Sequence, residues 1–117
     1  MKVVRKGQGP KEEFTSQNPL IIGEAWRENL VDSEHLNFGI VSFAMGARNK
    51  LHTHTSDQIL YVTHGKGIVA TQKEEVVVSE GDTVLIPAGE KHWHGATKDT
   101  EFAHAVIMKS GGTTAPA

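Results

Sequence analysis

Cysteine is absent from the 117 residues of this chain. Disulfide bonds and thiolate metal ligands are therefore excluded, so any metal site must use nitrogen or oxygen ligands. Positive charge is also scarce, because 12 basic residues stand against 14 acidic ones and the formal net charge is −2 at pH 7. No basic surface indicates binding to nucleic acid or to an anionic membrane, and we expect neither as a partner.

Long apolar segments are missing as well. No stretch approaches the ~20 apolar residues of a membrane-spanning helix. Residues 1–14, MKVVRKGQGPKEEF, carry basic side chains but lack the apolar core of a signal peptide. We therefore expect a cytoplasmic protein.

Helical periodicity is equally scarce. No window of ten or more residues carries apolar side chains at i, i+3, i+4 and i+7, and only a short helical turn near residues 11–14 is considered. A chain of this length buries one core. We expect one all-β domain over residues 1–110, followed by a disordered tail over residues 111–117, GGTTAPA.

Short apolar segments separated by glycine and proline predict a series of β-strands. The expected strands cover residues 3–4, 20–26, 38–45, 59–63, 68–71, 76–78, 83–86 and 101–108. Gly65-Lys66-Gly67 predicts a hairpin turn between two of them. Many short strands with such turns are typical of a sandwich or barrel.

Histidine is the one unusual abundance, with seven in the chain. His52 and His54 are two residues apart, so in a strand they share a face with Cα atoms ~6.6 Å apart. Gln58 follows after a short break, and if the alternation resumes it shares a face with Leu60 and Val62. Its amide oxygen would then lie beside the two imidazoles. Two nitrogens and one oxygen form an incomplete metal site.

Further histidines follow in the second half of the chain. His92 and His94 come after an expected strand and a Pro/Gly turn, and their spacing places both on one face with Trp93 on the other. His104 lies on the face of the last expected strand that carries the larger side chains. We place this face inside the barrel. These residues can supply the ligands that the first pair lacks.

The pattern G-x5-H-x-H-x3-[E/Q]-x6-G begins at Gly46, and G-x5-P-x-G-x2-H begins at Gly81. Together they resemble the two motifs of the cupin superfamily, whose fold is a small double-stranded β-helix, or jelly-roll barrel. The motifs cover residues 46–92, and the flanking strands fit the same fold. The resemblance implies one divalent transition metal bound by His52, His54, Gln58 and His92.

Two positions depart from the usual motifs. Gln58 stands where glutamate is common, and Ala96 replaces an asparagine that often closes the second motif. With residues 87–97 and His104, these positions resemble small cupins related to those fused to carboxymuconolactone decarboxylase domains, a group that includes manganese-dependent hydroxynitrile lyases. The resemblance favours Mn²⁺ or Fe²⁺, while ligation by nitrogen and oxygen also suits Zn²⁺, Ni²⁺ or Co²⁺.

The neutral ligand set leaves a divalent ion with its full charge, which favours an anionic ligand in the open positions. His94 or His104, with a pKa expected near neutrality, would act as the catalytic base. Around them we expect an apolar pocket for a small organic substrate, formed by Leu60, Phe102, Val106 and Met108. The resemblance implies that Val41 and Phe43 face the same pocket.

Three functions remain open at this point, because the cupin fold hosts all of them. The first is a metal-dependent C–C lyase like the hydroxynitrile lyases, and the second is an Fe²⁺-dependent dioxygenase. The third is a non-catalytic binding or sensing protein. A small barrel has a limited core, so we also expect a homodimer or larger homo-oligomer that pairs an N-terminal strand or the surfaces around Trp26 and Trp93.

Overall fold

The computed structural model describes residues 1–13 and 18–117, and within these ranges every regular element is a β-strand. The strands are β1 Lys11–Glu13, β2 Ile21–Ile22, β3 Ala25–Asp32, β4 Leu36–Phe43, β5 Arg48–Asn49, β6 His52–His54, β7 Gln58–Thr71, β8 Glu75–Ser79, β9 Thr83–Ile86, β10 His92–Ala96, β11 Phe102–Lys109 and β12 Thr114–Pro116. The predicted all-β fold is confirmed, and the described part of the chain holds no helix that could cross a membrane.

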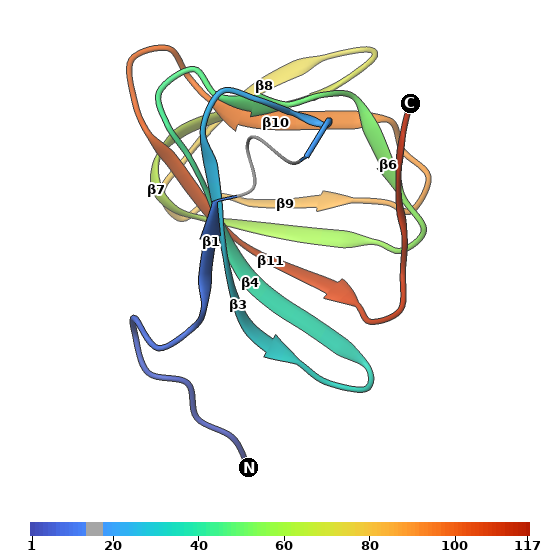
Figure 1. Cartoon of the computed structure of the whole chain (residues 1–117). Helices are drawn as coiled ribbons and strands as arrows, with labels where there is room; N and C mark the ends of the chain where they lie inside the picture. Colours follow the sequence, from blue (N-terminus) through green and yellow to red (C-terminus); the bar gives the residue numbers. More distant parts are fainter. Residues whose placement is uncertain (14–17) are drawn as a thin grey trace.

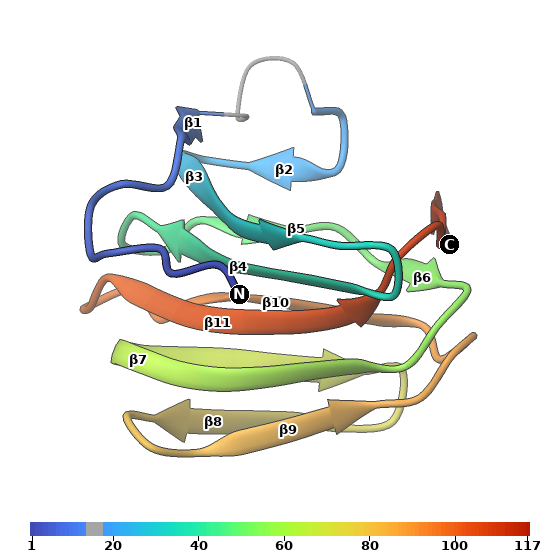
Figure 2. The same cartoon turned by 90° about the horizontal axis from the view of Figure 1, so that it is seen from below.

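The strands form a curled antiparallel sheet that folds into two facing layers (Figures 1 and 2). Its main path runs β1-β3-β4-β11-β7-β10-β5-β2, with β9 and β8 each paired to β7. Strand β6 pairs with β10 and with β12. Figure 1 shows β8 and β10 on one side of the barrel and β3, β4 and β11 on the other.

Strand β7 joins the two layers. Its first half pairs with β11 and β9, and its second half pairs with β10 and β8. The predicted hairpin at residues 65–67 is therefore wrong, because the strand continues through these residues. Gly65 has a φ of 70°, and a Cβ there would collide with the backbone oxygen of Glu101. Gly65 therefore allows β7 to bend and to pack closely against the backbone of Glu101. The chain does not reverse direction there.

Several N-terminal expectations also change. Residues 3–4 form no strand, and the strand expected over residues 20–26 is divided at Gly23, whose φ is 88°. Residues 11–13 form β1 instead of a helical turn, because they pair with β3. Phe14, the last residue of that expected turn, lies outside the described residues.

The C-terminal tail differs from the disordered segment that its composition predicts. Thr114 pairs with His54 and Pro116 with His52, so β12 covers the edge of β6. The tail is ordered because its backbone pairs with β6, which is distant in sequence, and the local sequence gives no sign of this pairing. The tail therefore belongs to the barrel and to the surroundings of the first histidine pair.

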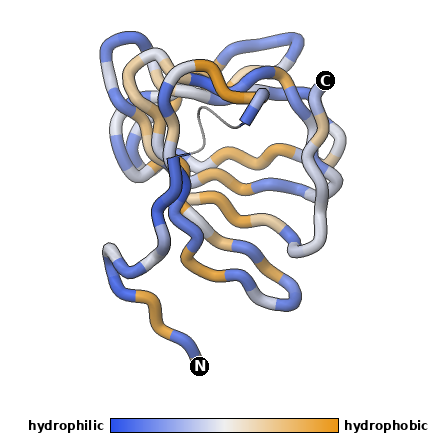
Figure 3. Tube along the Cα trace, in the orientation of Figure 1, coloured by the Kyte–Doolittle hydropathy of each residue, from blue (hydrophilic) through white to orange (hydrophobic). Residues whose placement is uncertain are grey.

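The core lies between the two layers. Phe43, Leu60 and Phe102 are fully buried there, and Gln58, Leu60 and Val62 alternate inward along β7 as predicted. Figure 3 shows apolar segments along the strands and polar ones at most of the turns. The inner face of β11 is the predicted one, because Phe102, His104 and Val106 are buried.

Candidate metal centre

Three histidines from two neighbouring strands converge inside the barrel. His52 and His54 lie on β6 and His92 on β10, where His92 is the direct partner of His52. One ring nitrogen from each lies within 4.8 Å of the others, and the rings of His52 and His92 are 4.3 Å apart. The period of two along each strand and the pairing between them bring together residues forty positions apart in sequence.

Hydrogen bonds orient each of the three rings. Nδ1 of His52 donates to the carbonyl oxygen of Lys50 at 2.7 Å, and Nδ1 of His92 donates to that of Glu90 at 2.8 Å. A carbonyl only accepts, so in both neutral rings Nε2 keeps a free lone pair. Nδ1 of His54 lies 2.8 Å from the Thr114 hydroxyl. Such partners fix the tautomer and ring orientation of metal-binding histidines.

Three buried polar atoms here have no hydrogen-bond partner within the described residues. They are Nε2 of His54, Nε2 of His92 and Oε1 of Gln58. Burying such atoms unpaired is costly, so each calls for a missing partner. The Gln58 amide nitrogen lies 3.6 Å from the Met108 sulfur, which leaves the amide oxygen for that partner. The donor set fits a divalent transition metal, with Gln58 supplying an oxygen beside three imidazoles.

All three imidazoles favour the neutral form that a metal requires. Burial lowers the pKa of His52 and His92 below the ordinary value. Burial, followed by the charges of His52 and His92, lowers the pKa of His54 to about 4. Protons therefore compete weakly with a metal at neutral pH.

A second polar group, His94 and His104, lies beside these histidines. Nδ1 of His104 donates to the carbonyl of Ala105 at 3.2 Å, so in the neutral ring its Nε2 accepts a proton from Nδ1 of His94 at 3.1 Å. Asn49 accepts from the His94 backbone N–H at 2.8 Å, which directs its amide NH₂ to His94 Nε2 at 3.3 Å. The three hydrogen bonds made by the two rings therefore point the same way, from the Asn49 amide through His94 and His104 to the Ala105 carbonyl.

The pKa values of this pair are lower than the sequence suggested. Burial lowers the pKa of His104 to about 4, and burial together with the neighbouring His104 lowers the pKa of His94 well below its ordinary value. The expectation of a pKa near neutrality is wrong for the protein without a ligand. Both rings are therefore neutral at pH 7, because burial disfavours the charged imidazolium.

A small cavity of about 150 Å³ opens beside these groups. Its lining comprises Asn18, Leu20, Ile21, Arg27, Val41, Asn49, His52, His54, Gln58, His94, His104, Val106, Met108 and Thr114. Three of the predicted substrate residues are among them: Val41, Val106 and Met108. The other three, Phe43, Leu60 and Phe102, do not line this cavity, although they belong to the same core cluster as Val41 and Val106. Phe43 packs edge-on against His94 with ring centres 5.7 Å apart.

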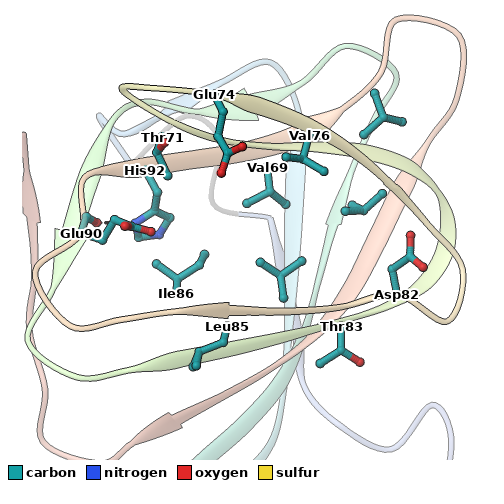
Figure 4. Close-up of a pocket in the computed structure, with 13 residues that line it drawn as sticks. Val69, Thr71, Glu74, Val76, Asp82, Thr83, Leu85, Ile86, Glu90 and His92 are labelled. Atoms are coloured by element: carbon teal, nitrogen blue, oxygen red, sulfur yellow. Dashed lines mark hydrogen bonds between the residues drawn. The ribbon is translucent and has the colours of Figure 1, made fainter.

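A larger cavity of about 470 Å³ lies between β8 and β9 (Figure 4). His92 and Glu90 lie at one end of it, and Asp82 and Thr83 at the other. Its walls are mostly valine and leucine with three carboxylates, and of the histidines only His92 reaches it. The smaller cavity is therefore the one lined by most of the converging polar groups.

Besides Asn18 in the cavity lining, three polar residues of the site were not anticipated from the sequence. They are Arg27 and Asn49, which line the cavity, and Thr114, which also contacts His54. Thr114 lies in the tail, and Asn49 lies on a two-residue strand outside the expected elements. Arg27 follows the end of an expected strand, but its inward direction depends on pairing with β4. No local pattern marks any of the three.

Comparison with known proteins agrees with this geometry. The chain is 44% identical over 109 residues to the (R)-mandelonitrile lyase of Granulicella tundricola, covering 88% of this chain and 76% of that enzyme. It is 35% identical over 57 residues to the acireductone dioxygenase of Leptospira biflexa, covering 45% of this chain and 32% of that enzyme.

Fold and family agree with the motifs. A cupin-like protein from Thermotoga maritima has a TM-score of 0.82 at 28% identity, covering 100% of this chain and 89% of that one. Residues 39–108 match the family described as Cupin domain. The barrel, the converging histidines and these matches together confirm the expected resemblance: this chain belongs to the cupin family.

Proposed function

We propose that this cupin is a metal-dependent lyase that cleaves or forms a C–C bond next to a hydroxyl group, as in cyanohydrin chemistry. The observation that carries the proposal is the set of unpaired, inward-facing atoms of His54, His92 and Gln58 beside a second, neutral histidine pair. The relative that is 44% identical is a mandelonitrile lyase, which supports the same reaction class.

His52, His54, Gln58 and His92 are the residues that would hold the metal, with Mn²⁺ or Fe²⁺ favoured. A divalent cation at this position supplies Lewis-acid stabilisation of developing negative charge. Since all four ligands are neutral, none of them offsets that charge. The carbonyls of Lys50 and Glu90 and the hydroxyl of Thr114 keep the imidazoles aimed inward.

His94 and His104 supply the proton transfer. In the cleavage direction the substrate hydroxyl loses its proton, its oxygen forms a carbonyl, and the electrons of the breaking C–C bond leave with cyanide. The proton is taken by His94 at Nε2, where the 3.3 Å contact to Asn49 is the longest of the three hydrogen bonds in this chain of groups. Transfer of the His94 Nδ1 proton to Nε2 of His104 then spreads the charge over both rings.

The apolar side chains of the cavity exclude water and position the substrate. Val41 and Val106 are buried and Met108 is half-buried, and all three line the space next to the histidines. Exclusion of water strengthens the interactions made with developing charge. A cavity of about 150 Å³ restricts the substrate to a small organic molecule.

The test is anaerobic cleavage of mandelonitrile by Mn²⁺-loaded protein, with metal-free protein as the control. We expect turnover only in the loaded protein, and we expect His104→Ala to lower kcat by about 10²–10⁴-fold while metal content is retained. Full activity without metal would contradict the proposal.

The second candidate is an Fe²⁺-dependent dioxygenase, supported by the acireductone dioxygenases that are similar to half of the chain. It predicts O₂ consumption by the Fe²⁺-loaded protein and a dispensable His104. Absence of mandelonitrile cleavage together with O₂ uptake would favour this function.

A further inference from the structure

The small cavity adjoins a second cavity whose lining includes two positively charged side chains, those of Arg27 and Lys109. An adjoining cavity of about 180 Å³ shares Arg27, Val106, Met108 and Thr114 with the first, and it adds Lys109. None of the described residues that line either space is an aspartate or glutamate. The chain as a whole is acidic, and the cavity of Figure 4 has three carboxylates in its lining, so the absence is local to the histidine site.

Arg27 faces the interior of the barrel. It pairs with Val41 on β4, which in turn pairs with His104 on β11. Residues paired directly across antiparallel strands lie on the same face, so Arg27, Val41 and His104 form one inward row.

The guanidinium is oriented but lacks a counter-ion. Its Nε donates to the Asn29 side-chain oxygen at 2.8 Å. No carboxylate of the described residues pairs with it, and residues 14–17, Phe-Thr-Ser-Gln, include no acid. A half-buried cation of this kind is stabilised by an anion, and the planar fork of arginine matches a carboxylate with two parallel hydrogen bonds.

We propose that Arg27 binds the carboxylate of a small organic acid, whose apolar body lies against Val41, Val106 and Met108 and whose reactive carbon faces the histidines. Lys109, which is exposed, also lines the adjoining cavity and adds to the attraction. This inference extends the proposed function, and it rests on the proposal that the active site lies in this cavity. It names the substrate class as small carboxylates that also carry a hydroxyl or carbonyl group.

The test compares 4-formylbenzoate with 4-formylbenzamide, which have nearly the same shape and differ in charge. Binding of each to Zn²⁺-loaded and metal-free protein is measured by calorimetry. We expect the parent to prefer the carboxylate by about 10- to 100-fold, the range for a hydrogen bond to a charged group. Arg27→Gln should abolish the preference and leave affinity for the amide unchanged, while Arg27→Lys should keep part of it.

Arg5→Gln is the matched control, because Arg5 is exposed and its loss changes net charge equally. It should retain the full preference. An equal affinity of the parent for both compounds would overturn the proposal. A preference for the carboxylate that survives in Arg27→Gln would also overturn it. If that surviving preference appeared only in the metal-loaded protein, the metal and not Arg27 would bind the carboxylate. The binding comparison does not depend on mandelonitrile cleavage. The lyase proposal and the proposal of carboxylate binding by Arg27 can therefore be refuted independently.

Discussion

His94 donates a hydrogen bond from Nδ1 to Nε2 of His104 over 3.1 Å, and both rings are buried. The partners at either end, Asn49 and the carbonyl of Ala105, leave one arrangement of protons for the neutral pair. Two histidines ten residues apart in sequence therefore act as one titrating unit. Their position beside the three converging imidazoles allows the same unit to serve a metal-dependent reaction.

Replacing Gln58 by glutamate adds a negative charge to the proposed ligand set. We expect the metal to be held more tightly and anions such as cyanide or benzoate to bind more weakly, because the metal loses part of its net charge. Metal analysis and anion titration of the loaded proteins check this. Lyase activity should fall at full metal content. Undiminished anion binding in the variant would contradict the role of a neutral ligand.

Replacing Thr114 by valine removes the hydrogen-bond partner of His54 Nδ1. Loss of such a partner typically weakens metal binding by about 10- to 100-fold. Competition with a chelator measures the change. Thr113→Val is the matched control, since the described contacts of Thr113 come from its backbone. Equal metal affinity in both variants would show that the C-terminal strand does not support the site.

Replacing Asn49 by aspartate should reverse the hydrogen bond to His94. A carboxylate only accepts, so Nε2 of His94 must then carry a proton while Nδ1 still faces His104. We expect the pKa of His94 to rise, which ¹⁵N NMR of the imidazoles detects. Asn49→Ala, which removes the amide without adding charge, should leave His94 neutral at pH 7. Neutral His94 in the aspartate variant would refute the assigned proton arrangement.

Acid should destabilise the metal-free protein through its buried histidines. His104 has a pKa of about 4 in the folded state and about 6.5 in the unfolded chain, so the unfolded chain binds the proton first. The stabilising contribution is complete above about pH 6.5 and is lost as the pH falls toward about 4. For His104 alone, the free energy of unfolding should drop by about 2 kcal/mol between about pH 7.5 and about pH 5.

Urea unfolding at the two pH values tests this expectation. The variant His104→Gln should lose less stability on acidification than the parent does. His64→Gln is the control, because His64 is exposed on the outer surface, and it should behave like the parent. The same acid dependence in all three proteins would contradict the assignment.

Self-association remains a prediction. The outer sheet face exposes Ile59, Tyr61, Leu85 and Ile107, which is a large apolar surface for a chain of 12.7 kDa. Burial of such a surface between two copies would stabilise a small barrel. We expect light scattering to give at least twice the mass of one chain at micromolar concentration. A monomer under these conditions would exclude a stable assembly.

The sequence by itself determined which histidines share a strand face and which of them could hold a metal ion. The period of two along a strand is local, so His52 and His54, and likewise His92 and His94, share a face whatever surrounds them. The inward direction of Gln58 and His104 followed from the apolar residues that alternate with them. Motif spacing then identified the fold, because those residues lie on turns and strands that the cupin barrel requires.

Only the tertiary structure decided which inward residues line the cavity and which fill the core. Phe43 and Val41 share one strand face and both belong to the core, yet only Val41 also lines the cavity. Arg27 and Thr114 reach the histidines through pairing with distant strands. The pKa of His104 is lowered by burial, and the residues that bury it come from distant parts of the sequence. Such neighbours come from long-range pairing, which no local pattern encodes.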